Sequence, residues 1–122
     1  MIVMVERPWG YFAVLEDAPT HKVKRIAVYE GQRLSLQSHE KRAETWVFTK
    51  GDGLVTIDGT DRVVMAKSLI KIPMGAKHRV KNIGQGHLEF IEVQTGEYFG
   101  EDDIYRYEDD YGRSDGTTNA RS

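Results

Sequence analysis

The sequence has no cysteine and no long hydrophobic run, and each absence excludes a class of protein or site. Without cysteine there are no disulfide bonds, no thiolate metal sites and no cysteine nucleophile. No apolar stretch approaches the roughly 20 residues that a membrane-spanning helix needs. The apolar start, Met1 to Val5, has no basic segment before it and runs directly into Glu6, Arg7 and Pro8, so the sequence predicts no secretory signal.

An excess of charge of one sign is also lacking. The 17 lysines and arginines nearly balance the 19 acidic residues, which leaves a net charge of −2. A dedicated nucleic-acid-binding protein usually shows a clear basic excess. With 39% hydrophobic and 30% charged residues, the composition is that of a folded, water-soluble chain. We therefore expect a cytoplasmic protein whose partners include neither a membrane nor a nucleic acid.

The length of 122 residues leaves room for a single domain. We expect this domain to span residues 1–113. The remaining residues, 114–122, are small and polar and offer no apolar side chain for packing, so they are predicted to form a flexible tail.

Short apolar and β-branched stretches, separated by turn residues about every eight to twelve positions, favour strands over helices. No segment sustains helical spacing, and at most residues 101–107 allow a helical turn. The pair Asp58-Gly59 between two alternating runs predicts a β-hairpin. The pattern as a whole predicts an all-β antiparallel sandwich or barrel, with strands over residues 11–15, 23–29, 34–39, 45–49, 54–57, 62–65, 69–72, 78–81 and 88–94.

Side chains of the kind that bind metals gather in two places that are distant in the sequence. Gln37, His39 and Glu44 share one segment, whereas His78 belongs to a later strand. Because side chains alternate along a strand, Gln37 and His39 are expected on the same face. Two imidazoles, an amide oxygen and a carboxylate would suit Zn²⁺, Fe²⁺, Mn²⁺, Co²⁺ or Ni²⁺. From the spacing alone, a set of ordinary hydrogen-bonded side chains stays open as the alternative.

These residues also fit a known pattern. The spacing Gly31-x5-Gln37-x-His39-x4-Glu44-x6-Gly51, followed by Pro73-x-Gly75-x2-His78-x3-Asn82, resembles the two cupin motifs. The first motif usually opens its ligand pair with His, where this chain has Gln37, and the glycine that usually precedes the second motif is Lys67. Both departures point to one branch, because further segments resemble type II mannose-6-phosphate isomerase: residues 7–10, 31–37, 42–46, 72–79, 91–98, 100–104 and 110–113.

The resemblance implies a cupin double-stranded β-helix, which is a jelly-roll barrel. It implies a metal-dependent isomerase that interconverts mannose 6-phosphate and fructose 6-phosphate. The cofactor would be a divalent ion, with Zn²⁺ first and Mn²⁺, Co²⁺, Fe²⁺, Ni²⁺ or Mg²⁺ as alternatives, and its ligands would be Gln37, His39, Glu44 and His78. Two other functions stay open: a non-catalytic or regulatory cupin that binds sugar, and a related cupin enzyme for a nucleotide sugar or a keto acid.

An aldose–ketose exchange moves a proton between C1 and C2 of the sugar, so it needs a carboxylate that is not a metal ligand. We expect Glu92 or Glu101 to act as this catalytic group. Glu92 lies on a predicted strand, and its direction depends on which face of that strand is interior. Glu101 follows the last predicted strand, where a lid can close over the site.

The same reaction needs cations that hold the phosphate at a distance from the reacting carbons. Lys24 has the strand parity of inward-facing residues, where an unpaired ammonium is costly, so it is expected to bind an anion. Arg79 should face away from His78 on a regular strand, and Arg106 is placed to reach over the mouth. The cations predicted to bind substrate are Lys24, Arg42, Arg79 and Arg113.

The resemblance also bears on assembly. Its bifunctional members carry a nucleotidyltransferase domain before the cupin, which 122 residues cannot hold, so a free-standing cupin is expected. A homodimer is also expected, because small cupins often pair N-terminal strands across sheet edges and a small chain gains core in this way. The expected small-molecule partner is a sugar phosphate.

Overall fold

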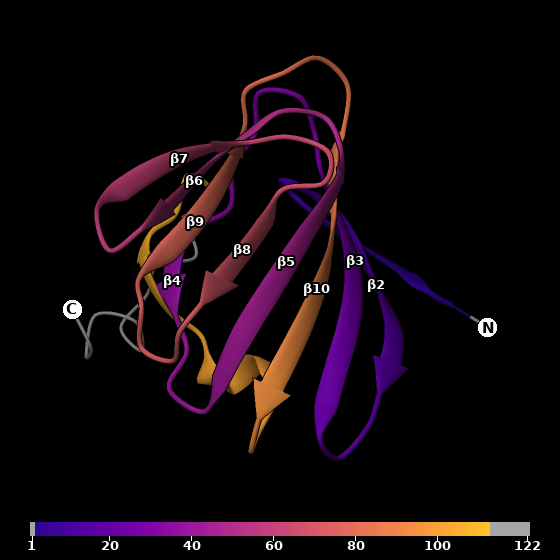
Figure 1. Cartoon of the computed structure of the whole chain (residues 1–122), viewed down its shortest axis with the longest axis vertical. Coiled ribbons are helices and arrows are strands. Elements are labelled where there is room, and N and C mark those ends of the chain that lie inside the picture. Colours follow the sequence, from indigo (N-terminus) through magenta and orange to yellow (C-terminus); the bar gives the residue numbers. More distant parts are fainter. Residues whose placement is uncertain (1, 113–122) are drawn as a thin grey trace.

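The computed structural model describes residues 2–112 as two antiparallel sheets that face each other (Figure 1). Sheet A has the strand order β1-β2-β3-β10-β5-β8, formed by Met4–Arg7, Gly10–Asp17, His21–Val28, Leu88–Gly96, Arg42–Lys50 and Leu69–Ile72. Sheet B has the order β11-β4-β9-β6-β7, formed by Tyr105–Glu108, Leu36–Ser38, His78–Asn82, Gly53–Ile57 and Thr60–Val64. The predicted tail, residues 114–122, lies outside the described residues, as do Met1 and Arg113.

The all-β prediction is confirmed, and each predicted strand overlaps an observed one. The Asp58-Gly59 hairpin is confirmed as well: it joins β6 to β7, and its two residues have φ angles of 48° and 84°. Both angles lie in the left-handed region that a two-residue hairpin of this type requires, which asparagine, aspartate and glycine tolerate best.

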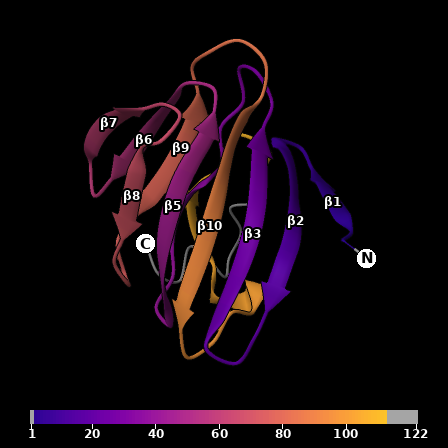
Figure 2. The ribbon, with the colours of Figure 1, turned by 45° about the vertical axis from the view of Figure 1, so that its right-hand side comes forward.

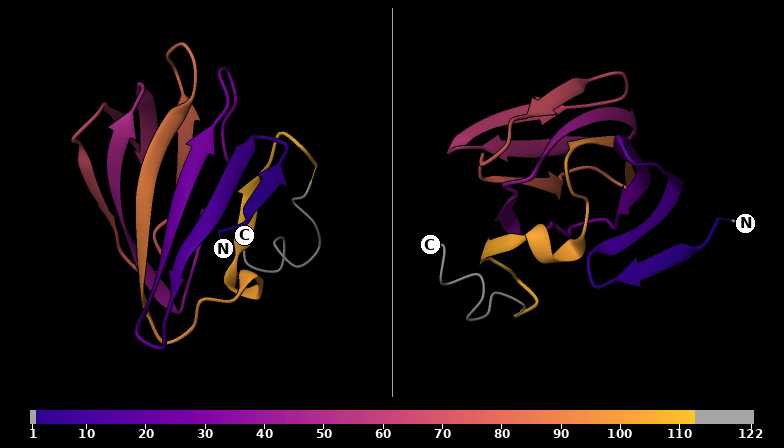
Figure 3. Two further views of the ribbon diagram at one scale, coloured as in Figure 1. Left: turned by 90° about the vertical axis from the view of Figure 1, so that its right-hand side faces the viewer. Right: turned by 90° about the horizontal axis from the view of Figure 1, so that it is seen from below.

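Two strands were missed from the sequence, and one helical turn is shorter than expected. β1 and β11 are edge strands of four residues each, too short to show a clear alternation of apolar and polar side chains. The helical turn covers only Glu101–Asp103, a 3-10 helix called η1, and the chain then becomes extended in β11. η1 lies at the lower end of the sandwich, beside the end of β10 and the start of β5 (Figures 1 and 3).

The edge of sheet A exposes apolar side chains. β1 is the outermost strand on that side (Figure 2), and Ile2, Val3 and Met4 at its start are exposed. An exposed edge with apolar side chains is a place where another strand can pair. Dimerisation through this edge stays a prediction. Among the described residues there is no helix of the length and apolarity that crossing a membrane requires.

The core fills one end of the sandwich. Trp46, Phe48 and Phe90 form its aromatic centre, with ring centroids 4.8 Å apart for both Trp46–Phe90 and Phe48–Phe90. Such offset ring pairs add to the stabilisation that burial of their apolar area provides. Aliphatic side chains from both sheets pack around them: Ile26, Val28, Val55, Val64, Ile70, Ile72, Val80 and Leu88.

Candidate metal centre and pocket

The inward-facing positions of three neighbouring strands change from apolar to polar towards the same end of the sandwich. On β5 the buried sequence runs Arg42, Glu44, Trp46, Phe48, and on β10 it runs Leu88, Phe90, Glu92, Gln94. The strands are antiparallel, and their register places Glu44 opposite Gln94. The polar halves therefore coincide, and Lys24 of β3 joins them opposite Glu92. The fold thus separates an apolar core from a buried polar end.

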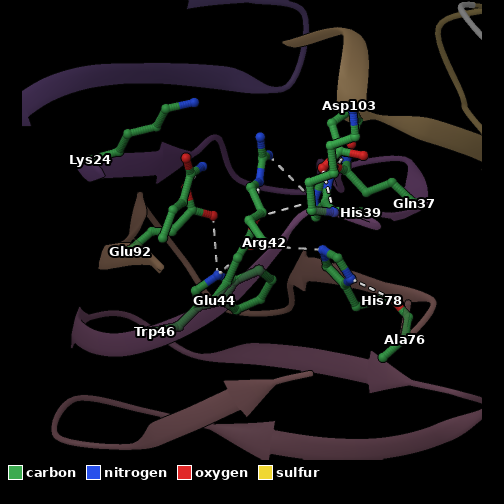
Figure 4. A network of polar contacts seen from close by, with 12 residues as sticks. Lys24, Gln37, His39, Arg42, Glu44, Trp46, Ala76, His78, Glu92 and Asp103 are labelled. Atoms are coloured by element: carbon green, nitrogen blue, oxygen red, sulfur yellow. Dashed lines mark hydrogen bonds and ion pairs between the residues drawn. The ribbon is translucent and has the colours of Figure 1, made fainter. Parts of the chain in front are cut away.

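Three buried side chains converge at this polar end (Figure 4). His39, Glu44 and His78 each offer one ligand atom, and these atoms all lie within 4.8 Å of one another. His39 Nε2 is 3.1 Å from Glu44 Oε2, and His78 Nε2 is 3.8 Å from Glu44 Oε1. The structure therefore brings His78 to the segment that carries His39 and Glu44, and we call these three residues the triad.

Backbone carbonyls determine which ring nitrogen of each histidine faces the carboxylate. His39 Nδ1 donates to the Asp103 carbonyl oxygen at 2.9 Å, and His78 Nδ1 donates to that of Ala76 at 3.0 Å. Because a carbonyl can only accept, each Nδ1 carries a proton, and a neutral ring then presents the Nε2 lone pair to Glu44. Two lone pairs and a carboxylate around one point require a positive charge there. This donor set fits a divalent metal ion.

Arg42 supplies part of that positive charge. Its Nε donates to Glu44 Oε2 at 3.1 Å, and one of its terminal nitrogens lies 3.5 Å from His39 Nε2. Its other terminal nitrogen donates to the Gly100 carbonyl at 3.4 Å. The sequence left two roles open for Arg42, binding of phosphate and orientation of Glu44. The hydrogen bonds in the structure favour the second role.

Gln37, the fourth predicted ligand, lies beside the triad. It is paired with His78 in the register of β4 and β9, and it lines the pocket described below. Its Nε2 donates to Ser35 Oγ at 2.9 Å, which leaves its oxygen to be the ligand atom. The role of Gln37 in metal binding stays a prediction.

Burial and neighbouring charges separate the pKa values of the ionisable groups here. Burial raises the pKa of Glu92 well above its usual 4.5, and the charge of Glu44 raises it further. Burial also acts to raise the pKa of Glu44, but its close contact with His39 outweighs burial, so this pKa lies well below 4.5. Burial lowers the pKa of His78 from 6.5 to about 4. At neutral pH the Glu44 carboxylate is therefore ionised and the His78 imidazole is neutral.

A pocket opens above Glu44 and His78 and encloses about 630 Å³, including the space at its mouth. His39 does not line the pocket, so its imidazole reaches Glu44 from outside the pocket wall. Five cationic and three acidic side chains line the pocket: Arg7, Lys24, Arg42, Arg79 and Arg106, with Glu44, Glu92 and Glu101. This excess of positive charge suits an anionic ligand.

Lys24 faces inward as its strand parity predicted, and it is only 6% exposed. Its Nζ lies 3.6 Å from Glu101 Oε2 and 4.6 Å from the centre of the Phe12 ring. The anion that a buried ammonium needs is thus a carboxylate of the protein. The Glu101 side chain is 53% exposed, so it can move away when another anion reaches Lys24.

Arg79 was expected to face away from His78 on a regular strand, yet its side chain lines the same pocket as His78. The arginine side chain is long enough to donate through Nε to the Leu34 carbonyl at 3.2 Å and through Nη1 to Glu108 at 3.0 Å. Its Nη2 is buried and has no hydrogen-bond partner among the described residues. A buried N–H group without an acceptor lowers the stability of the fold, and a ligand oxygen that accepts its hydrogen bond would remove this cost.

Sequence reasoning gave no role to two residues that the structure places here. Arg7 lines the pocket, and Asp103 accepts the His39 hydrogen bond. Both belong to segments that carry the family resemblance, and that is the only signal by which they could have been found. Arg106, expected near the mouth, does line the pocket. Arg113, a predicted substrate-binding residue, lies outside the described residues.

Comparison with known proteins identifies relatives over most of the chain. Residues 1–109 match the family described as mannose-6-phosphate isomerase C-terminal. The chain is 46% identical over 110 residues to xanthan biosynthesis protein XanB of Xanthomonas campestris pv. campestris strain B100, a match that covers 90% of this chain and 24% of that protein. It is 42% identical over 110 residues to a mannose-1-phosphate guanylyltransferase of Salmonella montevideo, covering 90% and 23%. The chain thus spans about a quarter of the length of these relatives.

Several solved structures have a fold similar to that of this chain. The cupin domain of Schizosaccharomyces pombe Cnp3 superposes with a TM-score of 0.72 and 16% identity, over 77% of this chain and 68% of that one. At this identity the likeness concerns the fold alone. The predicted cupin double-stranded β-helix is therefore confirmed, while the chemistry must be argued from the site.

Proposed function

The chain belongs to the family of mannose-6-phosphate isomerase C-terminal domains, and from this premise we propose that it is a metal-dependent isomerase interconverting mannose 6-phosphate and fructose 6-phosphate. One observation carries the proposal: a single pocket reaches the triad, a buried carboxylate outside the triad, and several cations. An isomerase for a hexose phosphate needs a group for each of these tasks, namely charge stabilisation, proton transfer and phosphate binding.

We propose that His39, Glu44 and His78 hold the metal, with Gln37 as a fourth ligand. When bound, a divalent ion supplies positive charge that stabilises the negative charge developing on the sugar oxygens during proton transfer. Zn²⁺ is our first candidate, because two imidazoles and a carboxylate are a common zinc donor set. Arg42 orients Glu44 through its hydrogen bond.

We assign the proton transfer to Glu92 rather than to Glu101. Glu92 lines the pocket and is buried, and its oxygens accept hydrogen bonds from Trp46 Nε1 at 3.2 Å and Gln94 Nε2 at 2.8 Å. A carboxylate held in this way can take and return a proton without changing its position. Glu101 is half exposed and bound to Lys24, so it suits control of access at the mouth.

Arg79 supports phosphate binding more directly than the other cations do. Lys24, Arg42 and Arg79 each pair with a carboxylate, that of Glu101, Glu44 and Glu108 respectively. Arg79 has in addition a buried Nη2 without a partner among residues 2–112. A phosphate oxygen would complete this donor with a charge-assisted hydrogen bond. We propose that Arg79 is the principal phosphate ligand and that Lys24 assists once Glu101 moves.

Arg79→Gln is expected to raise KM for mannose 6-phosphate by roughly 10–100-fold with little change in kcat, because one charge-assisted hydrogen bond to the phosphate is lost. Steady-state kinetics measure both constants. Arg33→Gln is the matched control, since Arg33 also binds the C-terminal segment, through Asp110 at 2.8 Å, but does not line the pocket. An unchanged KM in Arg79→Gln would remove Arg79 from the phosphate site.

Metal removal tests the function itself. Chelator-treated protein is expected to lose turnover of mannose 6-phosphate and to regain it when Zn²⁺ or another divalent ion is added back. A coupled assay that follows fructose 6-phosphate measures this, with glucose 6-phosphate as the competing substrate. If neither sugar phosphate is converted but mannose 6-phosphate still raises the melting temperature, the chain is instead a non-catalytic, sugar-binding cupin.

Guanylyltransferase activity appears in the names of relatives that are about four times as long as this chain. That activity is not part of the proposal, and the sequence carries no glycine-rich phosphate loop of the P-loop or dinucleotide type. A cytoplasmic location, as expected from the sequence, remains part of the proposal.

A further inference from the structure

Asp103 is a buried carboxylate that belongs neither to the triad nor to the pocket wall. It is the last residue of η1 and is 3% exposed. Its two oxygens accept hydrogen bonds from the backbone nitrogens of Glu40, at 3.1 Å, and Lys41, at 2.9 Å. Both donors lie in the turn between β4 and β5, directly after His39. The side chain therefore ties the C-terminal segment to the turn that follows this histidine.

The main chain of the same residue contacts the histidine itself. The Asp103 carbonyl oxygen accepts the hydrogen bond from His39 Nδ1 at 2.9 Å, so the proton is on Nδ1 and the Nε2 lone pair faces Glu44 (Figure 4). One residue thus holds the turn with its carboxylate and orients the ring with its carbonyl. Both contacts join η1 to the same short stretch of chain, residues 39–41.

Neighbouring contacts hold the same two segments together. The Glu97 backbone nitrogen donates to the Lys41 carbonyl at 3.0 Å, and Arg42 donates to the Gly100 carbonyl at 3.4 Å. Gly96 has φ of 149°, and a Cβ there would lie 2.3 Å from the Lys41 carbonyl oxygen, so only glycine allows this approach. The segment after β10 is therefore packed directly onto the turn that carries His39 and Arg42.

We propose that Asp103 is a positioning residue for the metal centre: its carboxylate holds the β4–β5 turn against η1, and its carbonyl thereby keeps His39 in the tautomer and orientation that bind a metal. The inference rests on the proposed metal site but not on isomerase activity. A residue that merely joins two segments would contribute to stability and leave the metal site of the folded protein unchanged.

Asp103→Asn tests the proposal because it replaces one acceptor oxygen with an NH₂ group that faces a backbone N–H. The variant is expected to bind Co²⁺ roughly 10–100-fold more weakly than the wild type, the loss typical when a partner that orients a metal ligand is removed. It should also change the visible absorption of the bound Co²⁺. Asp102→Asn is the matched control, since Asp102 is exposed in the same helix and accepts from the Tyr98 hydroxyl. The control should bind Co²⁺ like the wild type.

A second measurement needs no metal. Correlation of the imidazole ¹⁵N and ¹H resonances at one mildly alkaline pH reports which ring nitrogen of His39 carries the proton. The wild type should show Nδ1–H, and Asp103→Asn should gain the Nε2–H form. Wild-type Co²⁺ affinity together with an unchanged tautomer in Asp103→Asn would overturn the proposal. If the wild type binds no Co²⁺, the metal site itself is refuted, and the tautomer measurement alone then tests whether Asp103 orients His39.

Asp103→Glu covers the case in which the asparagine variant does not fold. It keeps both acceptor oxygens but moves them by one methylene, so its Co²⁺ affinity should fall between those of the wild type and Asp103→Asn. Full wild-type affinity with the carboxylate displaced would show that Asp103 does not position His39.

Discussion

His78→Ala is expected to abolish stoichiometric metal binding, and with it all turnover of mannose 6-phosphate, while the protein stays folded. His78 presents a neutral imidazole whose Nε2 lies 3.8 Å from Glu44 Oε1. Among the described residues, His39 is the only other histidine of the triad, so no further imidazole there replaces the lost ligand. Loss of one nitrogen ligand leaves too few donors for tight binding. His39→Ala should have the same effect. Elemental analysis after dialysis against Zn²⁺ measures the metal content.

The fold should survive because the lost hydrogen bond, from His78 to the Ala76 carbonyl, costs about 1–3 kcal/mol. Circular dichroism with thermal unfolding checks this. His21→Ala is the matched control: it also removes an imidazole that contacts a carboxylate, that of Glu16 at 2.7 Å, but far outside the pocket wall. Full metal occupancy in either His39→Ala or His78→Ala would overturn the ligand assignment.

Glu92→Gln is expected to lower kcat by roughly 10²–10⁴-fold, the usual contribution of a positioned acid–base group, while metal content stays at the wild-type level. The substitution keeps the shape of the side chain, but an amide cannot take up and return a proton. One oxygen of Glu92 accepts from Trp46 and the other from Gln94, so the amide keeps one of these contacts and needs rotation of the Gln94 side-chain amide to keep the other. Single-turnover kinetics with metal analysis on the same sample separate chemistry from metal loss.

Glu89→Gln is the control on the same strand. Glu89 lies three positions before Glu92 and so on the outer face of β10, where it pairs with Lys50 at 3.8 Å. It should leave kcat unchanged. If Glu92→Gln keeps wild-type kcat while Glu101→Gln loses it, the proton transfer belongs to Glu101 and the assignment to Glu92 is wrong.

Comparison of Glu92→Gln with the wild type also separates the proposed enzyme from a sugar-binding cupin. If the protein is the enzyme, mannose 6-phosphate still binds Glu92→Gln and raises its melting temperature, but the variant forms product far more slowly than the wild type. If the protein only binds sugar, the wild type also binds mannose 6-phosphate without converting it. The comparison of wild type and variant in one assay therefore decides between the two functions.

Strand alternation was sufficient to predict much of this site. It placed Glu44 on the face of Trp46, and it placed Lys24 among the inward residues of its strand, as the structure confirms. Alternation is a local rule, because successive side chains of an extended chain point to opposite faces whatever the strand pairs with. The spacing of ligand-type residues, read together with the family resemblance, then connected His39 and Glu44 with the distant His78.

Alternation failed where a side chain is long or where the chain is not in a regular strand. Arg79 starts on the outer face of β9, yet its guanidinium reaches Leu34 and Glu108 and lines the pocket. The partner of Lys24 could not be predicted either. Glu101 follows the sheet in an irregular segment, and no periodicity indicates which end of the barrel that segment covers.

The sequence by itself determined an all-β antiparallel sandwich or barrel with inward-facing polar residues at defined strand positions, because hydrophobic periodicity and turn residues act over a few neighbouring positions. The family resemblance then narrowed this fold class to a cupin. Only the tertiary structure decided that these polar positions meet at one end and that η1 packs against the turn after His39. Asp103 is 64 residues from His39 in the chain. A contact over that separation depends on how the strands pair, which no local pattern encodes.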